Sequence, residues 1–321
     1  MYVYALSYTL DLTTNGKHTT GASTLEYVLS IAQREQACIE NLPRFPRPEG
    51  IFGGPGSYQP TAAKKLAVLQ DFRKVASFLA VEIPVLWHTD LHPDNIFVDP
   101  DNPSKVVSII DWQSVHIAPL FQQAATPAFL DFEGPKPDEG VSGPSLPENF
   151  EVLSAAEQAQ AKTLQTQQSL YKLYEIQPAR QNKEVFKALQ YSSSLGSQII
   201  SLVSQAFNDG EPIIRGQLIQ LAQEWDRIVG KDRQTCPLSV TADDIREQEH
   251  DLQKWEEGVQ LMEDVLDSLG GVENGWQGWV SYEDYDQMRD KLAAVKEQFL
   301  DHMAGSLEER EAWSRVWPFQ D

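Results

Sequence analysis

The sequence predicts an α+β fold that is mostly helical, with a short β-hairpin carrying a polar site. Three apolar runs rich in β-branched and aromatic residues lie close together, at Val85–Trp87, Ile96–Val98 and Val106–Ile110. Most of the remaining chain places its apolar residues at helical spacing. Because so few strands are predicted, helices must supply most of the hydrophobic core.

Two helices are predicted before the first strand. The first, Ser23–Asn41, opens with Ser23 and Glu26, which have the spacing of a capping box. The second is Thr61–Ala80. The apolar stripe of the first helix consists of Leu25, Val28, Leu29, Ala32 and Ile39, and that of the second of Leu66, Leu69, Phe72, Val75, Ala76 and Leu79. Each stripe predicts one buried face.

The chain beyond the strands is predicted to form a long loop and then a helical block. The loop, Asp131–Phe150, is rich in proline, glycine and glutamate. Within the block, the Gly275–Val280 segment carries two tryptophans; we expect them to anchor a turn on the core, with a ligand site as the alternative. The predicted helices are Glu151–Tyr174, Lys183–Phe207, Pro212–Val229, Asp243–Leu269 and Ser281–Met303.

The polar loop between the first two strands carries the most specific chemistry. It reads His88-Thr89-Asp90-Leu91-His92-Pro93-Asp94-Asn95, and Asp111 follows the third strand. In phosphoryl transfer an Asp receives the proton of the attacking hydroxyl, while an Asn and a second Asp hold Mg²⁺ on the nucleotide. Asp90 is therefore the candidate catalytic base, and Asn95 and Asp111 supply the oxygen ligands that Mg²⁺ prefers. We expect His88 and His92 to brace the loop.

These strings resemble a known family. Leu86–Val98 and Ile110–Gln113 are similar to the aminoglycoside phosphotransferase superfamily, a kinase-like group, and in particular to the fungal branch that includes Altered inheritance of mitochondria protein 9. Leu25–Glu35 and Pro119–Phe121 are similar to that branch too. The resemblance runs from about Gly21 to the C-terminus. It implies the large lobe of a protein-kinase-like fold, ATP and Mg²⁺ as cofactors, a small-molecule hydroxyl acceptor and a mitochondrial location.

The small lobe of a complete kinase-like enzyme contains a β-sheet with a Gly-rich loop and a strand lysine on the phosphates. Here 87 residues precede His88, and the two predicted helices among them, Ser23–Asn41 and Thr61–Ala80, resemble large-lobe helices and not a small-lobe sheet. We therefore expect residues 1–20 to be a vestigial segment with at most a strand or two, Tyr2–Leu10 being one candidate, and residues 21–321 to form the large lobe. The Gly53–Gly56 cluster contains Pro55, which lacks a backbone N–H, so a surface loop is favoured over a phosphate-binding loop.

Two hypotheses about function follow. Asp90, Asn95 and Asp111 together favour a phosphotransferase that acts on a hydroxyl acceptor. The short region before the motif favours a large-lobe remnant without turnover, a pseudoenzyme whose open face could bind a protein partner. We expect the chain on its own to be inactive.

Composition excludes several classes of partner. The net charge of −21 and the pI near 4.6 argue against nucleic acid and anionic membrane surfaces, which require basic surface. No apolar run is long enough to span a bilayer. Cys38 and Cys236 lack metal-site spacing, which favours a reducing compartment. No transit peptide is readable, so the residues alone predict a cytoplasmic location.

Overall fold

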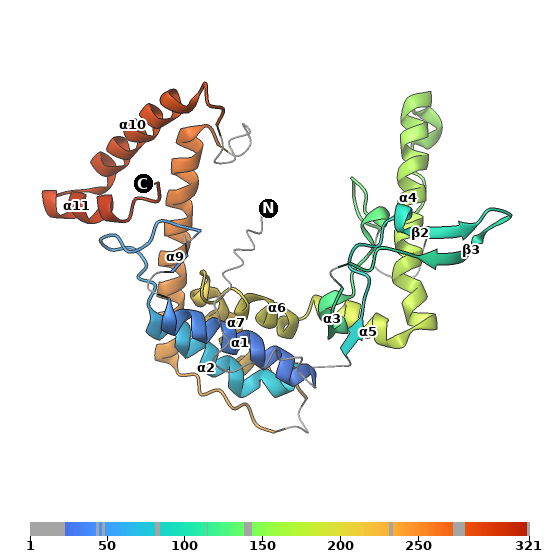
Figure 1. The fold of residues 1–321 in the computed structure, drawn as a ribbon, viewed down its shortest axis with the longest axis horizontal. Coiled ribbons are helices and arrows are strands. Elements are labelled where there is room, and N and C mark those ends of the chain that lie inside the picture. The colour runs from blue at the N-terminus through green and yellow to red at the C-terminus, as the bar shows by residue number, and fades with distance from the viewer. Residues whose placement is uncertain are drawn as a thin grey trace. The chain divides into compact units, whose positions relative to one another are not determined.

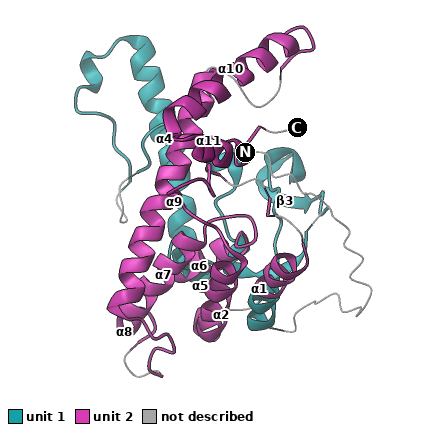
Figure 2. Cartoon of the chain, turned by 90° about the vertical axis from the view of Figure 1, so that its left-hand side faces the viewer, with its two compact units in different colours: residues 1–30, 80–194 teal, residues 31–79, 195–321 magenta. Residues whose placement is uncertain are grey.

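A computed structural model describes residues 23–42, 45–46, 49–80, 84–113, 115–137, 143–230, 234–271 and 280–319. The chain divides into two compact units, unit 1 with residues 1–30 and 80–194, and unit 2 with residues 31–79 and 195–321 (Figure 2). Helices dominate both units, which confirms the predicted mostly helical α+β class (Figure 1). The predicted strand Tyr2–Leu10, the boundary at residue 20 and the tryptophan turn at 275–279 lie outside the described residues.

Unit 1 holds the strands of the described chain, arranged as two separate antiparallel pairs. β1 (Pro84–Leu86) pairs with β4 (Ile117–Pro119). β2 (Ile96–Asp99) pairs with β3 (Asn102–Ile109) as a hairpin whose register shifts on either side of Val98. The three predicted strands are confirmed, and β4 was not predicted.

A buried glutamine fastens the β1–β4 pair. Gln123 ends the short helix α3 (Leu120–Gln123), and its Nε2 donates to the carbonyl oxygens of Val85 and Ala118, each at 2.9 Å. One residue of β1 and one of β4 are thus held by the same side chain. The buried Phe121 packs edge-on against Tyr191, with ring centroids 4.9 Å apart. The Pro119–Phe121 patch therefore supports the strand that leads into the polar loop.

The helices of unit 1 differ from the prediction at their ends. A capping box between Ser154 and Glu157 starts α4, which covers Ala155–Gln181 and so continues past the predicted end at Tyr174. The prediction of one helix over 183–207 is wrong, because α5 (Lys183–Ser192) ends at Ser192 and a separate helix, α6 (Leu195–Val203), begins at Leu195. The hydroxyl groups of Ser192 and Ser193 donate to carbonyl oxygens three residues back, and such bonds compete with helix continuation. Short 3₁₀ turns occupy Pro93–Asn95, Ala128–Leu130 and Phe150–Val152.

Unit 2 is helical in its described residues. The unit boundary falls inside α1, whose first turn is capped by Ser23 as predicted. The predicted helix 212–229 is interrupted at Glu224. The helix over Leu307–Arg315 was not predicted. The helices are α1 (Thr24–Asn41), α2 (Ala62–Leu79), α6 (Leu195–Val203), α7 (Glu211–Gln223), α8 (Trp225–Ile228), α9 (Ala242–Leu269), α10 (Tyr285–Met303) and α11 (Leu307–Arg315).

The glycine cluster before α2 serves turning and packing. Gly53 and Gly56 have φ of 84° and 72°, a conformation that L side chains rarely adopt. Gly54 is buried, and a Cβ atom added to it would lie 2.2 Å from the ring of Trp313. Trp313 belongs to the apolar cluster that joins α9, α10 and α11. The predicted loop between two helices is confirmed, and its glycines are explained without a phosphate.

A buried charge network links α2 to α7 within unit 2. Lys65 is 1% exposed, and its Nζ donates to the carbonyl oxygen of Ala206 at 3.0 Å and to Glu211 Oε2 at 3.2 Å. The hydroxyl of Tyr58 donates to Glu211 Oε1 at 2.8 Å. Burial, and then the Glu211 carboxylate, raise the pKa of Tyr58, so the phenol keeps its proton for that bond. The predicted stripe of α2 is wrong at Leu66, which is only partly buried, whereas Lys65 faces inward.

The described helices include none that is long and apolar enough to cross a membrane.

Candidate functional site

The polar loop after β1 is folded back on itself by Asn95. This residue ends the 3₁₀ turn Pro93–Asn95 and is buried, with 5% of its surface exposed. Its Nδ2 donates to the carbonyl oxygen of Asp90 at 3.0 Å, and its backbone N–H donates to the carbonyl oxygen of His92 at 3.0 Å. The side chains of Asp90 and Asp111 are exposed, so the loop presents its carboxylates to solvent while Asn95 anchors it.

The end of the hairpin is tied to the same loop. The backbone N–H of Ile110 donates to the carbonyl oxygen of Asn95 at 3.0 Å. The carbonyl oxygen of Ile110 lies 2.8 Å from His88 Nε2. Since Ile110 directly precedes Asp111, these bonds hold the backbone of Asp111 beside the loop. The structure thus brings the backbones of Asp90, Asn95 and Asp111 together, and their joint binding of one ion stays a prediction.

His88 is placed to brace this junction. A carbonyl oxygen can only accept a hydrogen bond, so the contact with Ile110 puts a hydrogen on His88 Nε2. The ring also stands edge-on to Trp112, at a centroid distance of 4.8 Å. Its Nδ1 is buried and has no hydrogen-bond partner among the described residues. His92 instead lies near the surface, where its Nδ1 is 3.7 Å from Asp94 Oδ2.

Asp111 has an unusual backbone conformation. Its φ is 60°, and it is the single non-glycine residue with a positive φ among the residues that the structure describes. This left-handed conformation costs a residue with a Cβ atom about 1–2 kcal/mol, and Asp tolerates it better than most. Strain of this kind gathers at functional sites, where the surroundings hold the residue in place. Here the two bonds to Ile110 provide that hold.

Replacing Asp111 should separate stability from function. We expect the free energy of unfolding of Asp111→Gly to be about 1 kcal/mol higher than that of Asp111→Ala, because glycine adopts φ of 60° without strain. Both variants lose the carboxylate, so both should lose metal–nucleotide binding. Urea denaturation of the two variants measures the difference. An alanine variant as stable as the glycine variant would contradict a strained Asp111.

The donor set fits a magnesium–nucleotide complex. Asn95 spends its amide nitrogen on the Asp90 carbonyl, which leaves Oδ1 as the atom for a metal. Asp111 offers an exposed carboxylate. Within the part of the chain that the structure describes, no group of three or more His, Cys, Asp or Glu side chains could hold a metal. One carboxylate and one amide are what Mg²⁺ takes from a protein when phosphates and water complete its shell.

The hairpin beside the loop exposes an unusual amount of apolar surface. Every residue of β3 is exposed. The exposed large apolar side chains on and next to the two strand pairs are Leu86, Phe97, Val98, Val106, Val107, Ile109, Ile110, Trp112 and Ile117. Contiguous exposed apolar surface marks interaction sites in many proteins.

Residues 56–138 match the phosphotransferase enzyme family, a range that includes the polar loop, the hairpin and Asp111. This match supports the aminoglycoside phosphotransferase, kinase-like superfamily that the motifs predicted. The chain is also similar to the Subtelomeric hrmA-associated cluster protein of Aspergillus fumigatus, in each of two strains, with 30% identity over 266 residues.

These matches cover 79% of this chain and 51% of each relative, so the chain spans about half the length of the curated relatives it matches. No solved structure matches the chain significantly. The finer resemblance to the branch that includes Altered inheritance of mitochondria protein 9 stays a prediction.

Proposed function

We propose that the site on residues 88–111 transfers the γ-phosphoryl group of ATP, bound with Mg²⁺, to a hydroxyl group of a small molecule. The observation that carries this proposal is the set of hydrogen bonds that ties Asp90, Asn95 and Ile110 together. It joins the candidate base, Asp90, to the candidate metal ligand Asn95 and to the residue directly before the second candidate ligand, Asp111. Phosphoryl transfer depends mainly on such positioning.

Each residue has one role in this proposal. Asp90 accepts the proton of the acceptor hydroxyl. At the same time the hydroxyl oxygen bonds to the γ-phosphorus, and the bond between that phosphorus and the ADP oxygen breaks. Asn95 and Asp111 would hold Mg²⁺, which screens the charge of the phosphates. His88 positions the end of the hairpin through Ile110 and does not touch the reacting atoms.

Turnover by this chain alone should be negligible. Efficient transfer needs a cation on the α- and β-phosphates and a loop that covers them. The lysines that follow the loop most closely, Lys105 and Lys136, pair with Asp99 and Asp131. We propose that a β-rich lobe with a Gly-rich loop and a strand lysine completes the enzyme.

A non-catalytic interaction module is the second candidate. The exposed apolar side chains of the hairpin, such as Phe97 and Val107, favour it, since a protein partner would bury them. In that case the polar loop would be retained as a fold element without turnover.

Assays with radiolabelled ATP separate the two candidates. The full-length Aspergillus fumigatus relative and this chain are each incubated with ATP, Mg²⁺ and a panel of sugars, amino alcohols and nucleosides. The enzyme proposal expects Mg²⁺-dependent transfer or ATP hydrolysis by the relative and negligible turnover by this chain. If neither protein binds or converts ATP, that result would contradict the enzyme proposal and favour the interaction module.

A further inference from the structure

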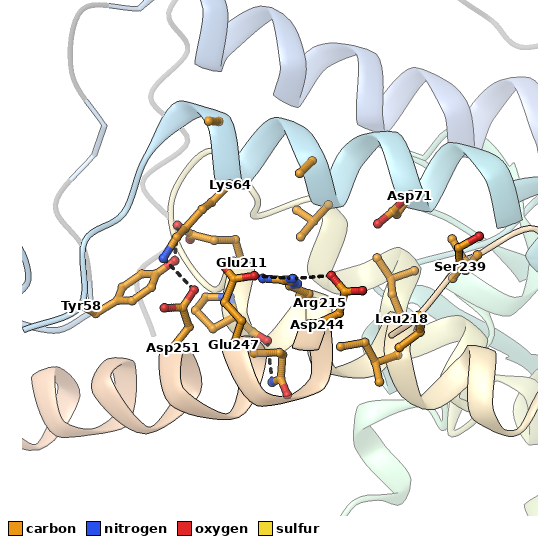
Figure 3. Close-up of a pocket in the computed structure, with 18 residues that line it drawn as sticks. Tyr58, Lys64, Asp71, Glu211, Arg215, Leu218, Ser239, Asp244, Glu247 and Asp251 are labelled. Carbon is orange, nitrogen blue, oxygen red and sulfur yellow. Dashed lines mark hydrogen bonds and ion pairs between the residues drawn. The ribbon is translucent and has the colours of Figure 1, made fainter. Parts of the chain in front are cut away.

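Unit 2 contains a pocket that the proposed phosphotransferase site does not use. It has a volume of about 420 Å³ and lies between α2, α7 and the start of α9 (Figure 3). Val68, Leu218 and Ile219 supply buried apolar surface, while charged side chains from all three helices line the rest. A volume of this size suits a small molecule.

One end of the pocket is built to hold a cation. The Nζ of Lys64 donates to Asp251 Oδ2 at 2.6 Å and lies 4.7 Å from the centre of the Tyr58 ring. An aromatic face together with a carboxylate is a general means of binding an ammonium group. The Tyr58 ring is fixed there, since its hydroxyl is bonded to the buried Glu211. Lys64 itself is less constrained, with 32% of its side chain exposed against 15% for Asp251.

The charges that line the pocket favour a positively charged ligand. The two carboxylates of Asp244 and Glu247 share a single cation, Arg215, at 3.3 and 3.0 Å, so this part of the lining carries a net negative charge. Elsewhere in the lining, Glu211 pairs with Lys65, and Asp71 pairs with Lys74.

Asp251 depends on Lys64 for its close cation. Its second ionic contact is His250 Nδ1, at 4.0 Å, which is charged only when protonated. If the Lys64 side chain swings into solvent, Asp251 is left without its close cation. A ligand cation can restore that pair, whereas an anion would face the three carboxylates of Asp244, Glu247 and Asp251.

We propose that this pocket binds a small organic ammonium compound with an apolar body, and that Lys64 occupies the cation position until the ligand arrives. The ligand's ammonium takes the place of the Lys64 Nζ between Tyr58 and Asp251, and its apolar body lies on Val68 and Leu218. Lys64 acts as a tethered competitor. It lowers the apparent affinity in proportion to the fraction of molecules in which the site is closed.

Calorimetric titration with hexylammonium, with 1-hexanol as the uncharged probe of the same length, tests this. Lys64→Met should bind hexylammonium about tenfold more tightly than the wild type, the factor expected if the site is open in about a tenth of molecules. Adding Asp251→Asn to that variant should abolish the gain. Lys254→Met is the matched control, because Lys254 has a similar exposure and pairs with Glu257 on α9 outside the pocket.

A measurement on the wild type covers a Lys64→Met variant that fails to fold. The Tyr58 ring current shifts the Hε protons of Lys64, and hexylammonium should move these resonances toward their values in a solvated lysine while 1-hexanol should not. Equal binding by Lys64→Met and Lys254→Met, an equal gain for 1-hexanol, or Lys64 resonances that ignore hexylammonium would each overturn the proposal.

Discussion

In a longer, active chain that carries the nucleotide lobe, Asp90→Asn should lower the turnover number by a factor of about 10² to 10⁴, the usual contribution of a general base. The amide cannot accept the hydroxyl proton. The loop should survive, because Asn95 bonds to the backbone carbonyl of residue 90 and not to its side chain. The measurement is steady-state turnover in a longer chain that carries the nucleotide lobe, with circular dichroism to check the fold.

Asp94→Asn is the matched control for that substitution. Asp94 belongs to the same loop, but its side chain is 95% exposed and faces His92 at 3.7 Å. We expect turnover of this variant to stay close to the wild-type value. Equal losses in the two variants would mean that the loop's charge matters and not the position of Asp90, which contradicts a base at that residue.

Lys65→Met should cost unit 2 about 3–5 kcal/mol of stability, because it leaves the Glu211 carboxylate buried without its cation. Lys65 and Glu211 are 1% and 2% exposed, so water cannot replace the lost partner. The variant is therefore expected to unfold at a markedly lower urea concentration. Adding Glu211→Gln should recover most of the loss, because the neutral amide still accepts from Tyr58.

Lys74→Met provides the control on the same helix. Lys74 pairs with Asp71 at 2.6 Å, yet the two side chains are 51% and 44% exposed. Such surface pairs contribute about 0–1 kcal/mol, so the urea midpoint should hardly move. A Lys65→Met variant as stable as Lys74→Met would show that the buried pair does not support unit 2.

The loop and hairpin that carry the candidate site could be predicted because their pattern is local in the sequence. Phosphoryl transfer needs its base and metal ligands as residue types at fixed spacing, whatever packs around them, and the roles of Asp90, Asn95 and Asp111 stay a prediction. The hydrogen bonds that join them connect residues within one strand–loop–hairpin segment. The left-handed conformation of Asp111 was not predicted, since aspartate is common in many conformations and no glycine marked the position.

The parts that were missed depend on partners far along the chain. Lys65 was not among the residues predicted to be buried, because Glu211 and Ala206, which accept its hydrogen bonds, lie 146 and 141 residues away. β4 has only three residues and is defined by its pairing with β1. The break after α5 has a local cause in Ser192 and Ser193, whose competing bonds outweigh an apolar stripe that continues through them.

Paramagnetic broadening by Mn²⁺–ADP tests the central claim, that Asp90, Asn95 and Asp111 form one metal–phosphate site, most directly. Mn²⁺ takes the same oxygen ligands as Mg²⁺, and broadening detects weak binding. In the ¹⁵N-labelled chain, the Asn95 side-chain amide and the Trp112 indole resonances should broaden first. Asp111→Ala should remove that effect, and Asp101→Ala, at the exposed hairpin tip, should preserve it. Broadening centred on other acidic residues, or unchanged by Asp111→Ala, would contradict a phosphotransferase site at these residues.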